Sequence, residues 1–207
     1  MQALFIHGMG RTPLSGWGLL RQLRAHGIDT STFGYATAIQ NFSQISNRLS
    51  SRIMRLADDG EYILIGHSLG GLLLRSALAS LPMETRAPSR VFLLGSPTQP
   101  ARLAKMLSRN PIFQMVTGDC GQMLASDDRM RGVPPVVAPT TGVFGNRGMP
   151  VTSLAFRGEP NDGVVSVSEA SAPWITDQVI VHVVHTFLPT SERVAAIILE
   201  RTCDRAA

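Results

Sequence analysis

The chain has 207 residues, of which 44% are apolar and 16% charged, and this composition excludes a disordered chain. Its length predicts one domain with a sizeable buried core. Basic residues outnumber acidic ones by 19 to 15, which gives a net charge of +4. The arginines are scattered and no basic run interleaved with aromatic residues occurs, so we expect no nucleic-acid partner.

Two cysteines, Cys120 and Cys203, are too few for a disulfide framework or a multi-cysteine zinc site. A bridge between them is one alternative, and two free thiols are the preferred one. No segment is typical of a membrane span or a secretion signal, because the chain runs from residues 3–6 directly into His7. We therefore expect a cytoplasmic protein with no integral membrane contact.

Short apolar runs in chain order predict the strands of a sheet. Five are rich in β-branched or aromatic residues and too short for helices, and a sixth, at residues 30–35, is weaker. Continuous rather than alternating apolarity indicates strands covered on both faces, as in a parallel sheet. The five runs are residues 3–6, 62–65, 91–94, 151–156 and 179–184.

Helical patterns alternate with these runs. Apolar residues at three- and four-residue steps predict a helix at residues 42–56, with Asn41 as its N-cap. A second, apolar nearly all round, is predicted at residues 69–81, and a last one follows Ser191. Alternating strands and helices predict a single α/β domain over residues 1–207, with a mostly parallel sheet of about six strands and right-handed crossovers.

Residues 95–150 form an excursion that is too long for a simple crossover. Its first half, from Ala101, is predicted to be helical, whereas residues 132–150 are rich in Gly and Pro and are predicted to be loop. Such an excursion either covers the active site or is a long surface loop with no role in the site, and the sequence favours the two interpretations about equally.

Residues 66–71, with the sequence GHSLGG, match the pattern G-x-S-x-G. The match lies between a predicted strand and a predicted helix, which is the context of a sharp turn that presents a serine hydroxyl at the carboxyl edge of a sheet. Ser68 is therefore the candidate nucleophile, and Leu69, the next residue, is a candidate amide donor to an oxyanion.

An activated serine needs a base, and the base needs an orienting partner. Asp162 lies in a turn that follows the predicted strand 151–156, and His185 follows the predicted strand 179–184. The order Ser68, Asp162, His185 is that of the α/β-hydrolases. Since all three follow strand ends, we expect the sheet to bring them together.

The chain resembles a minimal bacterial α/β-hydrolase, similar to small lipases and lipase-like esterases. The resemblance spans almost the whole chain, and its carriers are residues 4–10, 66–71, 94–97, 161–165 and 185–187. It implies that the first two strands of the usual eight are absent, since Met1 begins almost on the strand that ends in His7-Gly8. It also implies that the Met9 amide is the second oxyanion donor. The chain lacks the large helical cap that many relatives insert.

Rival residues exist for two of the three roles. His182 is the rival of His185, but we expect it inside the strand with its side chain pointing sideways from the sheet. Glu159 is the nearest alternative to Asp162. His7 and His67 flank the site and are expected to hold its loops by hydrogen bonding and packing.

These residues predict a serine hydrolase that cleaves carboxylic esters through an acyl-enzyme. The expected partner is a small-molecule ester or acyl substrate, and no metal or cofactor is expected. A thioesterase, an amidase or an acyltransferase uses the same parts, and a non-catalytic binding protein of the same fold is the competing class. The oligomeric state has no signal in the sequence. Four residues are predicted to make the mouth of the site apolar: Pro97, Val164, Val165 and Phe187.

Overall fold

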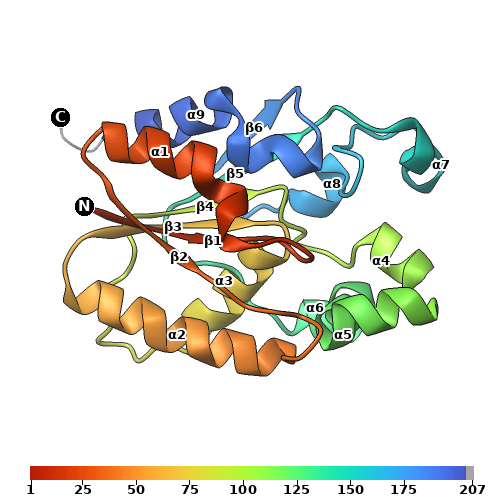
Figure 1. Ribbon diagram of the computed structural model, residues 1–207, viewed down its shortest axis with the longest axis horizontal. Coiled ribbons are helices and arrows are strands. Elements are labelled where there is room, and N and C mark those ends of the chain that lie inside the picture. Colours follow the sequence, from red (N-terminus) through yellow and green to blue (C-terminus); the bar gives the residue numbers. More distant parts are fainter. Residues whose placement is uncertain (204–207) are drawn as a thin grey trace.

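The computed structural model describes residues 1–203, which form a six-stranded sheet flanked by helices (Figure 1). All five strand pairings are parallel, and the strand order is β2-β1-β3-β4-β5-β6. The strands are β1 (Gln2–Ile6), β2 (Asp29–Phe33), β3 (Tyr62–His67), β4 (Arg90–Leu94), β5 (Thr140–Gly145) and β6 (Asp177–Val181). The predicted α/β class with about six strands is confirmed.

Helices cover both faces of this sheet. α1 (Trp17–Ala25) and α9 (Glu192–Cys203) lie on one face, and α2 (Phe42–Asp58) and α3 (Leu69–Ala79) lie on the other (Figure 1). In β1, Leu4 and Ile6 pack into the cluster that contains the α2 and α3 side chains, whereas Ala3 and Phe5 pack into the α1 and α9 cluster. Because alternate side chains are buried on opposite faces, the strand is continuously apolar.

α2 begins where the sequence predicts. The Asn41 side chain accepts a hydrogen bond from the Gln44 N–H, and the Gln44 side chain accepts one from the Asn41 N–H. This reciprocal capping satisfies two amides that the first helical turn leaves without partners.

The fifth strand is not at residues 151–156, and that prediction is wrong. Those residues form the short helices η2 (Pro150–Thr152) and α7 (Ser153–Phe156), whereas β5 lies in the segment predicted to be loop. Two glycines of β5 mark close packing and not a loop. A Cβ on Gly142 would lie 2.5 Å from the Phe144 ring, and one on Gly145 would lie 2.4 Å from the Val183 carbonyl oxygen.

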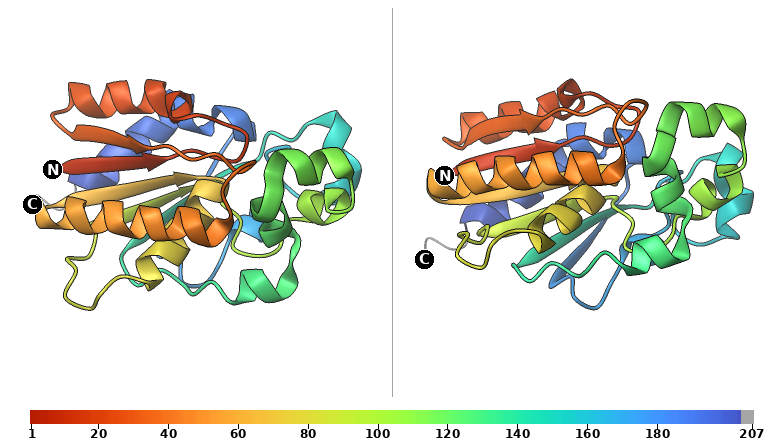
Figure 2. Two further views of the ribbon diagram at one scale, coloured as in Figure 1. Left: turned by 60° about the horizontal axis from the view of Figure 1, so that its bottom comes forward. Right: turned by 90° about the horizontal axis from the view of Figure 1, so that it is seen from below.

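The first part of the excursion is helical, as predicted. It contains α4 (Arg102–Leu107), α5 (Pro111–Ala125) and α6 (Asp127–Arg131), which lie together beyond the carboxyl ends of the strands (Figure 2). α5 is kinked at Gly118, whose φ is 53°. A Cβ there would lie 2.5 Å from the Thr37 carbonyl oxygen, so the glycine permits α5 to pack against the loop that precedes α2.

The remaining elements are η1 (Pro13–Gly16), α8 (Val167–Ala170) and η3 (His185–Thr190). Within residues 1–203, no helix combines the length and apolarity that crossing a membrane requires. Cys120 is a buried free thiol, and burial raises its pKa to about 12. The side chain of Cys203 lies outside the described part of the chain, but a free Cys120 leaves no bridge between the two cysteines.

Candidate active site

Ser68 lies in the turn between β3 and α3, with φ 54° and ψ −123°. A non-glycine residue rarely adopts a positive φ, and such strain persists only where the surroundings enforce it. Here the Ser68 N–H donates to the Leu94 carbonyl oxygen at 2.9 Å, which fixes the turn to the end of β4. The predicted sharp strand-to-helix turn is confirmed.

Glycines allow the backbones around this turn to approach one another. A Cβ on Gly66 would lie 2.5 Å from the Gly71 Cα, and one on Gly70 would lie 2.4 Å from the Ile6 carbonyl oxygen. Both contacts are with backbone atoms that cannot rotate away. The glycine positions of the motif are therefore required by packing.

Asp162 and His185 form a buried pair. His185 Nδ1 lies 2.6 Å from Asp162 Oδ2, and the two side chains are 8% and 1% exposed. The other carboxylate oxygen, Oδ1, accepts from the N–H groups of Val164 at 2.9 Å and Val165 at 2.8 Å. The backbone N–H of His185 also donates to the backbone carbonyl oxygen of Asp162. This arrangement holds the imidazole with Nδ1–H toward the carboxylate and leaves Nε2 as the basic nitrogen.

Asp162 reaches this position by a different path from the one the sequence predicts. Residues 146–161 separate it from β5, and η2 and α7 lie within them. It nevertheless packs on the end of β5, because a Cβ on Gly145 would lie 2.6 Å from the Asp162 Cβ. Asp162 therefore lies beside the penultimate strand, as predicted, although that strand is β5 and not residues 151–156.

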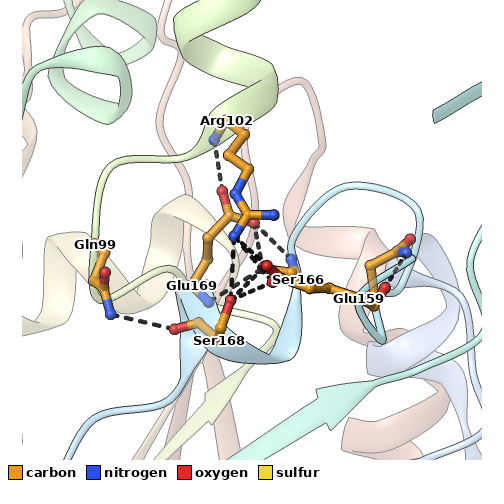
Figure 3. Close-up of polar contacts among 7 residues, drawn as sticks. Gln99, Arg102, Glu159, Ser166, Ser168 and Glu169 are labelled. Carbon is orange, nitrogen blue, oxygen red and sulfur yellow. Dashed lines mark hydrogen bonds and ion pairs between the residues drawn. The ribbon is translucent and has the colours of Figure 1, made fainter. Parts of the chain in front are cut away.

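A polar network that the sequence analysis missed holds the chain just after Asp162 (Figure 3). The buried Glu169 carboxylate accepts from the Ser166 N–H at 2.8 Å, the Ser166 hydroxyl at 2.7 Å and the Arg102 N–H at 2.6 Å. The first of these bonds and the bond that the Glu169 N–H donates to the Ser166 hydroxyl at 3.2 Å form the capping box of α8, whose S-x-x-E pattern is legible in the sequence. The third bond ties α8 to the start of α4.

His67 links the serine turn to the histidine. Its Nε2–H donates to the His185 carbonyl oxygen at 3.0 Å, and the two rings lie 4.8 Å apart. Its Nδ1 is buried and has no hydrogen-bond partner within the described residues. Burial, and next the positive charge available on His185, hold the pKa of His67 well below its usual range, so His67 is neutral.

The loop after β1 lies against the serine. A Cβ on Gly8 would lie 3.1 Å from the Ser68 Cβ, so Gly8 and the half-buried Met9 that follows it are next to the nucleophile position. Leu69 is the buried first residue of α3. Leu69 therefore follows Ser68 directly and Met9 follows the glycine that lies against it, and their role as oxyanion donors stays a prediction.

His7 and Tyr35 brace that loop. His7 Nδ1–H donates to the Gly8 carbonyl oxygen at 2.8 Å, and burial lowers the pKa of His7. The two rings stack at 4.2 Å, and the Tyr35 hydroxyl donates to the His7 carbonyl oxygen at 2.7 Å. Tyr35 carried no signal in the sequence analysis.

Beside this loop is a hollow of about 280 Å³ lined by His7, Gly10, Arg11, Thr12, Tyr35, Ala36, Thr37 and Ala38.

Ser68 and His185 share the end of β4 as a neighbour. Leu94 accepts the Ser68 N–H, and a Cβ on Gly95 would lie 3.0 Å from His185 Nδ1 and 2.9 Å from Asp162 Oδ2. In the part of the chain that the structure describes, no hydrogen bond joins the Ser68 hydroxyl to His185. Bonds of this kind are often long in ligand-free sites and tighten when substrate binds.

The rival residues have other partners. The prediction that His182 lies inside the strand is wrong, since β6 ends at Val181; His182 is exposed, and its Nδ1 lies 3.0 Å from Asn146 Oδ1. Glu159 accepts from Arg102 at 2.9 Å and from the Ser168 hydroxyl at 2.6 Å (Figure 3). Neither side chain takes part in the buried pair.

The four residues predicted to line the mouth of the site differ in exposure. Phe187 is 60% exposed, Val164 is half-buried, and Pro97 and Val165 are buried. Val165 packs in the core cluster, and the amides of both valines hold Asp162. Their contact with substrate stays a prediction.

The sheet order, the serine turn at the carboxyl edge and comparison with solved structures define the fold as that of the α/β-hydrolases. The chain is similar to the mature lipase BlEst2 of Bacillus licheniformis, with a TM-score of 0.79 and 17% identity over 97% of this chain and 91% of that one. The metagenomic carboxyl esterase MGS0156 aligns with a TM-score of 0.76 at 12% identity, covering 100% of this chain and 76% of that one.

A third similar structure is the RedJ thioesterase of Streptomyces coelicolor, with a TM-score of 0.62 and 16% identity over 97% of this chain and 84% of that one. No protein-family model matches the chain, and no curated protein matches it in sequence. At these identities the similarity establishes the fold, and the chemistry rests on the site residues.

Proposed function

We propose that this protein is a serine hydrolase that cleaves carboxylic esters. The observation that carries the proposal is the buried pair of Asp162 and His185, 2.6 Å apart, which packs on the same end of β4 that holds the strained turn of Ser68. A structural role does not call for an imidazole held in this tautomer next to such a serine. The resemblance of the fold to a lipase and a carboxyl esterase supports the same class.

In the proposed reaction, Ser68 Oγ attacks the acyl carbon while His185 Nε2 takes the hydroxyl proton. The ester C–O bond breaks, and the alcohol leaves with that proton. Water then attacks the acyl-enzyme through the same base, which releases the carboxylic acid and restores Ser68. Asp162 keeps Nδ1 protonated and stabilises the imidazolium that forms twice in each cycle.

The amides of Met9 and Leu69 are the proposed oxyanion donors. Two observations support this assignment: Gly8, which precedes Met9, lies against the Ser68 Cβ, and Leu69 opens α3 directly after Ser68. Loss of one donor of this kind typically costs about 3 kcal/mol of transition-state stabilisation.

The test is hydrolysis of p-nitrophenyl esters from short to long acyl chains, with Ser68→Ala beside the wild type. We expect kcat/KM to fall by about 10⁴-fold or more in Ser68→Ala. Ser80→Ala, at the opposite end of α3, is the matched control and should keep full activity. A fluorophosphonate should label the wild type and not Ser68→Ala.

Full esterase activity in folded Ser68→Ala would overturn the proposal. If neither hydrolysis nor labelling occurs in the folded wild type, the non-catalytic binding protein becomes the better interpretation. Matched thioester and amide substrates in the same panel identify the bond that is cleaved fastest.

A further inference from the structure

Exposed apolar side chains gather at one end of the molecule. Within residues 1–203, half of the large apolar side chains that are exposed belong to α4, α5, η2 and α7, beyond the carboxyl ends of the strands, or to Met149 beside η2 (Figure 2). Ile112 is 68% exposed and Met115 71%, and they lie on one side of α5, whereas Leu154 on α7 is 92% exposed. We define the apolar end as Met106, Leu107, Ile112, Met115, Val116, Met149, Val151 and Leu154.

The elements that carry these side chains are neighbours. α4 contacts both α5 and α7, and Met106 of α4 and Ala155 of α7 line the same hollow. An exposed apolar region made by adjoining elements usually marks an interaction surface. A folded monomer does not otherwise gain from placing Leu154 and Ile112 in water.

Charge distinguishes this end from the rest of the chain. Residues 101–160 hold seven basic and four acidic side chains, a difference of +3 out of the net +4 of the whole chain. All four acids are paired: Asp119 with Arg129, Asp127 with Lys105, Asp128 with Arg131 and Glu159 with Arg102.

Three arginines are left over. Arg109, Arg147 and Arg157 are exposed, and within the described residues none of them pairs with a carboxylate. Arg109 lies between α4 and α5, whereas Arg147 and Arg157 flank η2 and α7. The excess positive charge is therefore interleaved with the apolar side chains.

We propose that the apolar end docks on an anionic lipid surface. Apolar side chains between unpaired arginines are suited to the boundary between headgroups and acyl chains, where each kind of group meets its own partner. An isologous contact with a second copy would oppose the same three arginines across a two-fold axis, so like charge disfavours a dimer. Docking does not depend on the proposed chemistry, because none of these residues belongs to the catalytic site.

The experiment is co-sedimentation with sucrose-loaded vesicles of ether-linked lipids, which a hydrolase of esters cannot cleave. Phosphatidylcholine vesicles with and without phosphatidylglycerol are compared. We expect the wild type and Ser68→Ala to bind the anionic vesicles equally, and more strongly than the neutral ones. Added salt should weaken the binding.

Two variants test the two parts of the surface. Ile112→Ser/Met115→Ser should lower the partition coefficient on anionic vesicles by about 10-fold or more. Arg109→Gln/Arg157→Gln should lower it by about 5-fold per arginine and leave binding to neutral vesicles unchanged. The matched control is Met83→Ser/Val137→Ser, two fully exposed apolar residues outside the apolar end.

Three outcomes would overturn the proposal. They are absence of vesicle binding by the folded wild type, equal loss in the control variant, and a concentration-dependent dimer that Ile112→Ser/Met115→Ser abolishes. The last of these would assign the surface to a second copy of the chain. Vesicle binding and Ser68-dependent hydrolysis are separate readouts, so failure of one is distinguishable from failure of the other.

Discussion

The candidate site has two halves that are built in different ways. The half around Ser68 is fixed by contact between backbones. β3, α3 and β1 lie so close together that no side chain fits at Gly66 or Gly70. The half around Asp162 is fixed by hydrogen bonds to a loop, through the amides of Val164 and Val165. The glycines that permit the first arrangement lie within one short motif, although they pack against Ile6 of β1, whereas the second brings together Asp162 and His185 from separate segments.

The largest expected effect comes from breaking the hydrogen-bonded half. Asp162→Asn keeps an oxygen for the Val164 and Val165 amides, but its NH₂ would face His185 Nδ1 and select the other tautomer. We expect kcat to fall by about 10⁴-fold while the fold is retained. Steady-state kinetics on the best ester, with circular dichroism beside it, measures both.

Glu159→Gln is the matched control for that variant. Its carboxylate bonds to Arg102 and Ser168 at the surface, so kcat should change by less than ~2-fold. If Glu159→Gln lost as much activity as Asp162→Asn, the assignment of the acid would be wrong.

A backbone change breaks the other half. In Gly70→Ala the new Cβ would lie 2.4 Å from the Ile6 carbonyl oxygen and 2.6 Å from that of His7, so the backbone must shift. We expect the free energy of unfolding to fall by about 3 kcal/mol, as measured by urea denaturation, and esterase activity to fall with it.

Gly18→Ala is the control that shows whether replacing a glycine by alanine destabilises this protein wherever the glycine lies. Gly18 lies in α1, where a Cβ would be in ordinary contact at 3.5 Å from the Thr190 Cα. A small gain of about 0.5 kcal/mol is expected from reduced backbone entropy in the unfolded chain. Equal destabilisation by the two variants would contradict the close-packing explanation of the serine turn.

The comparison also explains what the sequence could predict. Local signals are sufficient for the serine turn and for α2, because the motif around Ser68 and the cap at Asn41 each lie within a few consecutive residues. β5 was misplaced because Gly142 and Gly145 indicate a loop when tertiary packing is unknown, although each accommodates a neighbour in the sheet.

Asp162 was found for a reason that was only partly right. The tight turn and the order of residues pointed to it, but its position beside His185 depends on residues 146–161 and on the Glu169 network, which join distant segments. The link from His67 to the His185 carbonyl spans 118 positions and has no sequence periodicity that could predict it.

That link connects the two halves and predicts a pH effect. Burial lowers the pKa of His67 in the folded protein, whereas in the unfolded chain it is about 6.5. The unfolded chain therefore binds a proton more readily, and stability falls as the pH drops below about 6.5 toward the lowered folded-state value. One such group contributes a slope of up to ~1.4 kcal/mol per pH unit.

His67→Gln tests this contribution. The glutamine NH₂ can still donate to the His185 carbonyl oxygen, but it does not titrate. We expect the unfolding free energy of the variant, measured by urea denaturation at a series of pH values, to decline less steeply below pH ~6.5. Because burial also lowers the pKa of His7, part of the decline should remain. Parallel curves for variant and wild type would contradict the prediction.

The smallest effect is expected where the serine half is braced from outside. Tyr35→Phe keeps the stack on His7 but removes the hydroxyl that donates to the His7 carbonyl oxygen at 2.7 Å, and it should cost about 1 kcal/mol of stability. Tyr62→Phe removes a similar bond, 2.6 Å long, to the Arg86 carbonyl oxygen away from the site.

If the Met9 amide stabilises an oxyanion, Tyr35→Phe should also lower kcat several-fold at nearly constant KM, because the loop it braces acts in the transition state. Tyr62→Phe should lower stability alone. An equal change of kcat in both variants would mean that the brace supports the fold and has no particular relation to the reaction.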